Sequence, residues 1–177
     1  ASTTAAGLAR VLALSGHRVV LVGGDLRSPS AVGAPGAPGL AEVLVGTARL
    51  SQVLVEGEVP GLELLPAGDM PGNPSELLGG RNMSDLLHHL AADRIVIIDA
   101  PPVCRFTDAV VLAEYAGGVL LVARAGRTSA EELREAALAV GQGGGHMLGV
   151  VLTNVSDLGR GSRSAQTAVT HAESATV

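Results

Sequence analysis

Two aspartates follow runs of apolar, mostly β-branched residues, and they are the first candidates for chemistry in this sequence. Asp99 comes directly after the run 95–98, IVII, and Asp25 follows the run 18–22, RVVLV, after two glycines. Unbroken apolar runs of this kind are typical of parallel strands that are covered on both faces. Open parallel sheets bind ligands at the carboxyl ends of their strands, and a carboxylate there can hold a Mg²⁺ that is shared with phosphates. Both aspartates are therefore candidate metal ligands and catalytic residues.

Each of these candidates also has a purely structural alternative. An aspartate at the end of a strand often caps the turn that follows, which would explain both Asp25 and Asp99 without a metal. Ser2 and Thr3 open the first predicted helix, where hydroxyl groups can bind a phosphate or simply cap the helix. The residues alone leave these alternatives open.

Other reactive side chains have simpler explanations. His88 and His89 are adjacent on a polar helix face without a converging partner, so we expect them to be solvated. Cys104 has no partner histidine in a recognisable motif and is expected to be a packed or half-exposed thiol. Tyr115, at helical spacing with apolar neighbours, is expected to serve packing.

Composition narrows the class of protein. The 177 residues suit one domain with a single core, and the 47% of apolar residues include only 1% aromatic residues. The net charge of −5 argues against a nucleic-acid surface. All of the basic residues other than histidine are arginine, so the chain has no lysine.

The single cysteine suits a reducing compartment, and no apolar run reaches the roughly 18 residues needed to cross a bilayer. The chain begins with Ala1, within a helix-like segment, so we expect that a segment precedes it.

Predicted helices and strands alternate along the chain. Continuous apolar runs predict strands at 18–22, 62–65, 95–98, 118–123 and 147–153. Periodic apolar residues predict helices at 3–15, 40–45, 50–55, 81–92, 107–116 and 129–142. This alternation predicts an α/β fold, with a mostly parallel sheet and helices on both faces. We expect one domain over residues 1–155 and a flexible tail over 156–177, which is rich in Ser, Thr, Ala and Gly.

Helix capping patterns support two of these boundaries. In GNPSELLGG, Asn73 can cap a helix, Pro74 suits the first helical position, and Glu76 completes a capping box. A second capping box, before residue 130, is offered by two overlapping pairs: Thr128 with Glu131, and Ser129 with Glu132.

Seven segments, taken in order, resemble the cytoplasmic domain of the bacterial tyrosine kinases that control capsule and exopolysaccharide synthesis. They are STTAAGLARVLALSGHRVVLVGGDLRSPS, GLAEVLVG, LELLPAG, PGNPSELLGG, VIIDAPPV, TDAVVLAEYAGGVLLVARAGRTS and LGVVLTNV. That family belongs to the deviant Walker A group of P-loop ATPases, together with cell-division and plasmid-partition ATPases. NPSELL and DLRSP are similar to the polysaccharide kinases rather than to these other ATPases. The resemblance implies a P-loop NTPase-like sheet that binds ATP and Mg²⁺.

The resemblance also implies where the phosphates would bind. Family members carry a GxGK[ST] loop whose amides and lysine hold phosphates and whose hydroxyl binds Mg²⁺. Ser2 and Thr3 match the hydroxyl positions, but Ala1 stands in the place of the lysine. The glycines and the first strand of the family are missing from this chain, so we expect the phosphate loop to be altered or to lie upstream.

Further positions follow from the same resemblance. The family's second strand ends in Asp-x-Asp, of which this chain has Gly23 and Asp25, with Arg27 close behind as a candidate cofactor-binding residue. Asp99 matches the Walker B aspartate, and Asn154 matches a strand-end position that can face adenine. The tyrosine cluster at the carboxyl terminus of family members is absent.

Three functions remain open at this stage. The first is an ATP-dependent tyrosine kinase domain, impaired by the missing lysine and acid, at the cytoplasmic face of the plasma membrane. The second is a module of the same descent without catalysis, which docks on a membrane-bound polysaccharide co-polymerase or on other copies of itself. The third is a partition-type ATPase.

Overall fold

The computed structural model describes residues 1–28, 32–34 and 36–155, and the predicted tail at 156–177 lies outside them. Within these ranges no helix is both long enough and apolar enough to cross a bilayer. The strands are β1 (Val19–Gly23), β2 (Val55–Glu56), β3 (Leu62–Leu65), β4 (Ile95–Asp99), β5 (Val119–Arg124) and β6 (Met147–Thr153). The helices are α1 (Ser2–Leu14), α2 (Leu40–Val45), α3 (Leu50–Val53), α4 (Pro74–Leu78), α5 (Arg81–Ala91), α6 (Asp108–Tyr115) and α7 (Ala130–Gln142).

The strands form two sheets in the described part of the chain. The larger sheet has the order β2-β3-β1-β4, in which β1 pairs in parallel with both β3 and β4. The second sheet is the parallel pair β5-β6. The α/β class and the mostly parallel pairing predicted from sequence are confirmed, but the strands are divided between two sheets instead of one.

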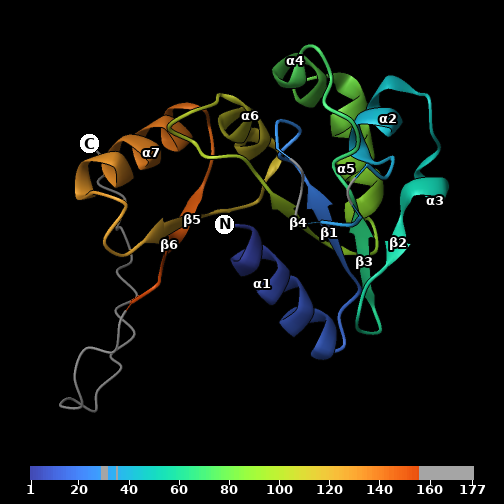
Figure 1. The fold of residues 1–177 in the computed structure, drawn as a ribbon, viewed down its shortest axis with the longest axis horizontal. Helices are drawn as coiled ribbons and strands as arrows, with labels where there is room; N and C mark the ends of the chain where they lie inside the picture. The colour runs from blue at the N-terminus through green and yellow to red at the C-terminus, as the bar shows by residue number, and fades with distance from the viewer. Residues whose placement is uncertain (29–31, 35, 156–177) are drawn as a thin grey trace, which may run out of the picture.

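Helices cover both faces of the larger sheet (Figure 1). On one face, Ala9 and Ala13 of α1 pack against Val19 and Leu21 of β1. The alternate β1 residues, Val20 and Val22, face the larger core on the other side. That core is completed by apolar residues of five helices, namely Leu40 and Leu44 of α2, Val53 of α3, Leu78 of α4, Met83, Leu86, Leu87 and Leu90 of α5, and Leu112 of α6. β1 is buried along its whole length because helices cover both of its faces and strands cover both of its edges.

One predicted helix is shorter than expected. The helical prediction for 50–55 is wrong at its end, because α3 stops at Val53 and Leu54 adopts an extended backbone. Val55 and Glu56 instead pair antiparallel with Leu64 and Glu63 of β3. Backbone pairing with a strand already in place thus overrides the local helical pattern.

The two capping predictions have different outcomes. The Ser129 hydroxyl accepts a hydrogen bond of 3.1 Å from the Glu132 amide, and the Glu132 carboxylate accepts one of 2.8 Å from the Ser129 amide. Pro74 is the first residue of α4, as predicted, but Asn73 makes no side-chain cap. The capping box predicted there is wrong, because the Asn73 side-chain amide itself donates to the Glu76 carboxylate.

Candidate functional site

The two candidate aspartates come together at one end of the larger sheet. Gly23 is the register partner of Asp99 across the parallel β1–β4 pair. The Gly24 amide donates a hydrogen bond of 2.8 Å to the Asp99 carbonyl, so Asp25 leaves the sheet directly beside Asp99. Both aspartates line one cleft together with Ser2 at the start of α1. The sequence prediction that the two acids share an edge of the sheet, opposite the opening helix, is confirmed.

Asp99 is the more enclosed of the two acids, with 5% of its surface exposed. Burial raises the pKa of its carboxyl group, and the negative charge of Asp25 raises it further. A hydrogen bond with the Ser2 side chain acts in the opposite direction and lowers the pKa. The site is therefore a pair of acids with a hydroxyl group beside them.

Close packing fixes the backbone between the strand and Asp25. A Cβ atom at Gly24 would lie 2.7 Å from Cγ2 of Ile98 and 3.0 Å from Cδ1 of Leu112. Only glycine fits there without displacing its neighbours. This packing keeps the turn that carries Asp25 close to β4 and α6.

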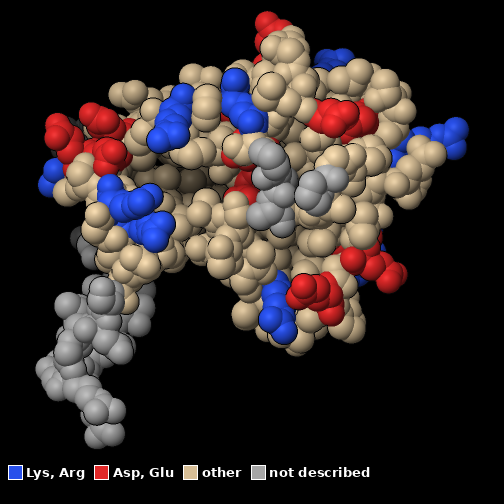
Figure 2. Space-filling model, in the orientation of Figure 1, with Lys and Arg blue, Asp and Glu red and all other residues tan. Residues whose placement is uncertain are grey.

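The cleft lies between β4 and β5 and has a volume of about 1190 Å³. Its walls include the β4 residues 95–99 and the β5 residues 119–122, and α1 contributes Ala5, Leu8 and Leu12. Figure 2 shows a hollow in this face of the molecule, with basic side chains around it and acidic side chains to its left and right. Arg105 and Arg127 are among the residues that line the cleft. The cleft is thus apolar along the strands and charged where the aspartates lie.

The strands that border this cleft have unpaired edges. β4 pairs only with β1, and β5 pairs only with β6, among the described residues. Ile95 is 38% exposed and Leu120 is 42% exposed, in contrast with the fully buried β1. The amino terminus of the chain lies between β4 and β5 (Figure 1). Two unpaired strand edges therefore border the same apolar space.

The remaining predicted site residues lie at different distances from this cleft. Ser2 lines it, whereas Thr3 is exposed and is not among its described lining residues. Asn154 follows β6, is exposed, and has a left-handed backbone with φ of 58°. The half-buried Tyr115 packs against the large core and also lines the cleft.

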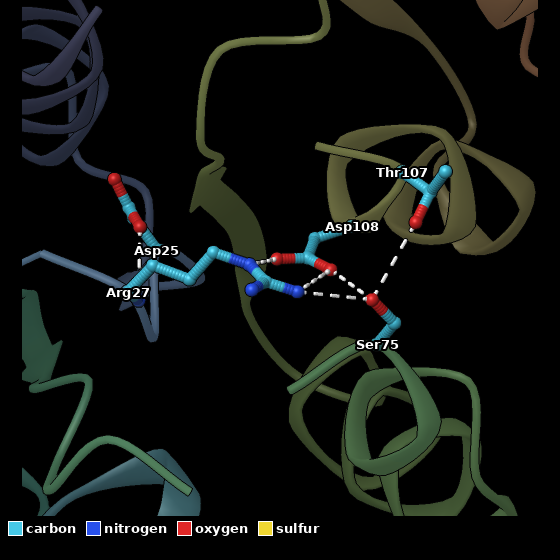
Figure 3. Close-up of polar contacts among 5 residues, drawn as sticks. All are labelled: Asp25, Arg27, Ser75, Thr107 and Asp108. Atoms are coloured by element: carbon cyan, nitrogen blue, oxygen red, sulfur yellow. Dashed lines mark hydrogen bonds and ion pairs between the residues drawn. The ribbon is translucent and has the colours of Figure 1, made fainter. Parts of the chain in front are cut away.

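Arg27 is held by an acid that the sequence analysis did not select. Its Nε donates to Oδ2 of Asp108 at 2.5 Å, and its Nη2 donates to Oδ1 at 3.1 Å. Nη2 also donates to the Ser75 hydroxyl at 3.2 Å, and Ser75 itself hydrogen-bonds to Asp108 (Figure 3). The Asp108 side chain is fully buried.

This ion pair shifts the pKa values of both partners. The hydrogen bond from Arg27 lowers the pKa of the Asp108 carboxyl group, and Ser75 lowers it further against the effect of burial. The same hydrogen bond raises the pKa of Arg27. Sequence spacing could not reveal a pair separated by 81 residues. A signal was nevertheless present, since Arg27, Ser75 and Asp108 each belong to a segment that carried the family resemblance.

The acids and the hydroxyl group fit a magnesium ion. Mg²⁺ prefers oxygen ligands and usually binds through one or two carboxylates while it keeps water and phosphate ligands. Asp25, Asp99 and Ser2 offer such a set at the cleft. No group of three or more His, Cys, Asp and Glu side chains converges within the described residues, so a site made of these side chains alone is not indicated there.

No protein-family model matches the chain. Curated relatives do match it. Tyrosine-protein kinase CpsD of Streptococcus agalactiae is 32% identical over 161 residues, which cover 88% of this chain and 70% of the relative. Tyrosine-protein kinase YwqD of Bacillus subtilis is 35% identical over 155 residues, or 85% of this chain and 65% of the relative. The chain spans about a fifth of the length of the first curated relatives it matches, as with tyrosine-protein kinase ptk of Acinetobacter johnsonii.

Solved structures agree with these relatives. The kinase domain of the Escherichia coli tyrosine kinase ETK superposes with a TM-score of 0.81 at 31% identity, covering 92% of this chain and 65% of that domain. MinD of Pyrococcus horikoshii, complexed with Mg-ADP, has a TM-score of 0.63 at 20% identity over 85% of this chain and 63% of that structure, which shows the fold alone. The chain belongs to the bacterial tyrosine kinase family and has the α/β fold of the P-loop ATPases.

Proposed function

We propose that the chain is the ATP-binding part of a tyrosine kinase of capsule or exopolysaccharide synthesis, with impaired catalysis. The observation that supports it most is the meeting of Asp25 and Asp99 at one end of the sheet, beside Ser2 and a cleft. Membership of the tyrosine kinase family supports the reaction type.

In this proposal Asp25, Asp99 and the Ser2 hydroxyl hold a Mg²⁺ that ATP shares. Bound Mg²⁺ with ATP supplies charge neutralisation during transfer of the γ-phosphoryl group to a tyrosine hydroxyl. Thr3 and Asn154 are the further residues that we assign to the nucleotide side of the site. The kinase family likeness supports ATP as the nucleotide.

Impairment follows from residue types. Ala1 stands where the family resemblance implies the lysine that neutralises the β- and γ-phosphates, and Gly23 replaces the first acid of the pair that the same resemblance implies. Charge stabilisation at the phosphates is the main catalytic contribution in phosphoryl transfer, so the loss should lower the rate by roughly 10²-fold or more. Tyr115, the only tyrosine in the 177 residues, is half-buried on α6.

The proposal includes a further parallel strand and a phosphate loop, absent from these 177 residues, that occupy the cleft between β4 and β5. The unpaired edges of β4 and β5 on the two sides of the cleft support this placement, because the free N–H and C=O groups of an edge strand can pair with a further strand. The position of Ser2 at the same cleft supports a loop that leads into α1.

Nucleotide titration with and without Mg²⁺ tests the proposal. We expect weak ATP binding that Mg²⁺ strengthens and that Asp99→Asn reduces, measured by isothermal titration calorimetry. Asp85→Asn, at an exposed position of α5 that is not among the cleft-lining residues, is the matched control. No ATP binding by the wild-type chain at millimolar nucleotide would overturn the proposal.

A docking module without catalysis is the second candidate. It would bind a membrane-bound polysaccharide co-polymerase or other copies of itself at the cytoplasmic face of the plasma membrane. The exposed apolar stripe of β6 favours it, since Leu148, Val150 and Leu152 are 62%, 47% and 56% exposed. The chimeric protein CapA2B2, with a TM-score of 0.81 at 32% identity over 85% of this chain and 69% of that protein, is a structural relative. Retention of the chain by the cytoplasmic ends of such a co-polymerase, lost in Val150→Asp, would support docking.

A further inference from the structure

We propose that Arg27 is a positioning residue whose ion pair with Asp108 holds the Asp25 turn against α6 and thereby sets the separation of the Asp25 and Asp99 carboxylates. This inference rests on the proposed function, because it assigns a cause to the geometry of the two acids. It gives Arg27 a role that differs from direct contact with a nucleotide.

The first support is the bidentate geometry of the Arg27–Asp108 contact. Two parallel N–H donors of one guanidinium meet the two oxygens of one carboxylate, at 2.5 and 3.1 Å. Such bidentate pairs fix orientation as well as distance. The guanidinium also lies 4.7 Å from the centre of the Phe106 ring, which covers one of its faces. The head group of Arg27 is therefore fixed on several sides.

The second support is that Arg27 contacts Asp25 through its backbone. The Arg27 amide donates a hydrogen bond of 3.1 Å to Oδ1 of Asp25. Figure 3 shows the Arg27 side chain extending away from the Asp25 carboxylate toward Asp108. Arg27 therefore binds the Asp25 carboxylate through its main-chain amide and binds Asp108 of α6 through its side chain. Any shift of Arg27 moves the group that orients Asp25.

The third support is that the anchor is connected to Asp99. Asp108 is the first residue of α6, and Leu112 of the same helix belongs to the large core against which Ile98 of β4 packs. Asp99 follows Ile98 directly in β4. The pair therefore connects the Asp25 turn to a helix that packs against the strand of Asp99. Ser75 adds the start of α4 to the same network.

The chain contains a matched control for this pair. Arg94 forms an ion pair with Glu63, and its side chain is 15% exposed. Arg94 lies directly before β4, at the opposite end of the strand from Asp99. Removal of Arg94 therefore breaks its ion pairs with Glu63 and Asp93 without touching the Asp25 turn.

The experiment compares the wild-type 177-residue chain with Arg27→Gln, Asp108→Asn, Arg27→Lys and Arg94→Gln. Hydrogen–deuterium exchange, followed by mass spectrometry, reports the opening of residues 24–28. We expect Arg27→Gln and Asp108→Asn to accelerate exchange there by about tenfold or more, and Arg94→Gln to leave it within about twofold. Arg27→Lys keeps the charge but loses the bidentate contact, so we expect an intermediate rate. If Asp108→Asn does not fold, the two Arg27 variants decide the question.

Titration with Mn²⁺, followed by electron paramagnetic resonance, then measures how tightly Asp25 and Asp99 bind a metal ion. We expect Arg27→Gln and Asp108→Asn to weaken Mn²⁺ binding by about 10–100-fold, as for other residues that orient metal ligands, and Arg94→Gln to change it less than about twofold. If Arg27 were instead a phosphate ligand, Asp108→Asn would free the guanidinium and leave Mn²⁺ binding unchanged. That result would overturn the inference, as would unchanged exchange at 24–28 in both Arg27→Gln and Asp108→Asn. No Mn²⁺ binding by the wild-type chain would overturn the proposed metal site alone, and the exchange data would still decide the role of Arg27.

Discussion

The Gly24 amide and the Asp99 carbonyl are joined by a hydrogen bond of 2.8 Å across the ends of β1 and β4. Asp25 is the next residue, so this bond ties the backbones of the two acids together. The contact uses main-chain atoms alone. The distance between the backbones of the two acids therefore depends on how closely β1 and β4 approach each other. This close approach is possible because residue 24 is glycine.

Gly24→Ala should disturb this approach. The added Cβ would lie within 3.1 Å of the Ile98 and Leu112 side chains and the Asp99 carbonyl, so we expect a loss of about 1–3 kcal/mol in the free energy of unfolding. Urea denaturation measures the change. Gly7→Ala in α1 is the control, because nothing lies within 4 Å of its Cβ and alanine favours a helix by about 1 kcal/mol. A Gly24→Ala protein as stable as the wild type would contradict the close packing.

Ser129→Ala should destabilise α7. The substitution removes the hydroxyl that accepts the Glu132 amide, which costs about 1 kcal/mol and lowers the Tm by roughly 2–4 °C in a domain of this size. Differential scanning calorimetry measures the shift. Ser51→Ala on the exposed side of α3 should change the Tm by less than about 1 °C. Equal effects of the two substitutions would argue against the cap.

Asp108→Asn should alter the pH dependence of stability. The pKa of Asp108 is lowered in the folded state, so its contribution is present above the unfolded value of about 3.9 and is lost as the pH falls through the folded pKa. We therefore expect the variant to be less stable than the wild type at pH 7, with a difference that shrinks as the pH falls below about 4. Urea denaturation between pH 7 and pH 3 measures both proteins. A difference that stays constant over this range would contradict the lowered pKa.

A strand placed in the β4–β5 cleft should stabilise the fold. An apolar strand and a glycine-rich loop added before Ala1 would pair with both free edges and bury apolar surface, so we expect the Tm to rise by several degrees. The matched control carries the same extension with two prolines in the strand, which removes donors needed for pairing. Equal Tm values for the two extended proteins would show that the cleft does not accept a strand.

The sequence was most informative where the signal is local. Apolar runs placed β1, β4 and β6. The expectation that such runs are covered on both faces holds for β1, whereas Ile95 of β4 and alternate residues of β6 are exposed. Ser129 and Glu132 are three residues apart, and their capping box was one of the two overlapping pairs that the local sequence offered. The sequence could predict that Asp25 and Asp99 lie close together, because both were expected at the carboxyl ends of strands in a parallel sheet.

Long-range contacts could not be predicted in the same way. The Arg27–Asp108 pair joins residues 81 positions apart, and no local pattern selects Asp108 over other acids. Val55 and Glu56 have a helical context, but their antiparallel partners in β3 decide their conformation. The division of the strands into two sheets likewise depends on which edges find partners, and this is not a property of any single segment.

Tyr115 gives the molecule its own optical reporter. It is the only tyrosine of the 177 residues, the chain has no tryptophan, and Tyr115 is one of the residues that line the cleft. Its ultraviolet emission therefore comes from one place in the fold. Whatever enters that space, whether a peptide or a nucleotide, can be followed by fluorescence without attaching a dye.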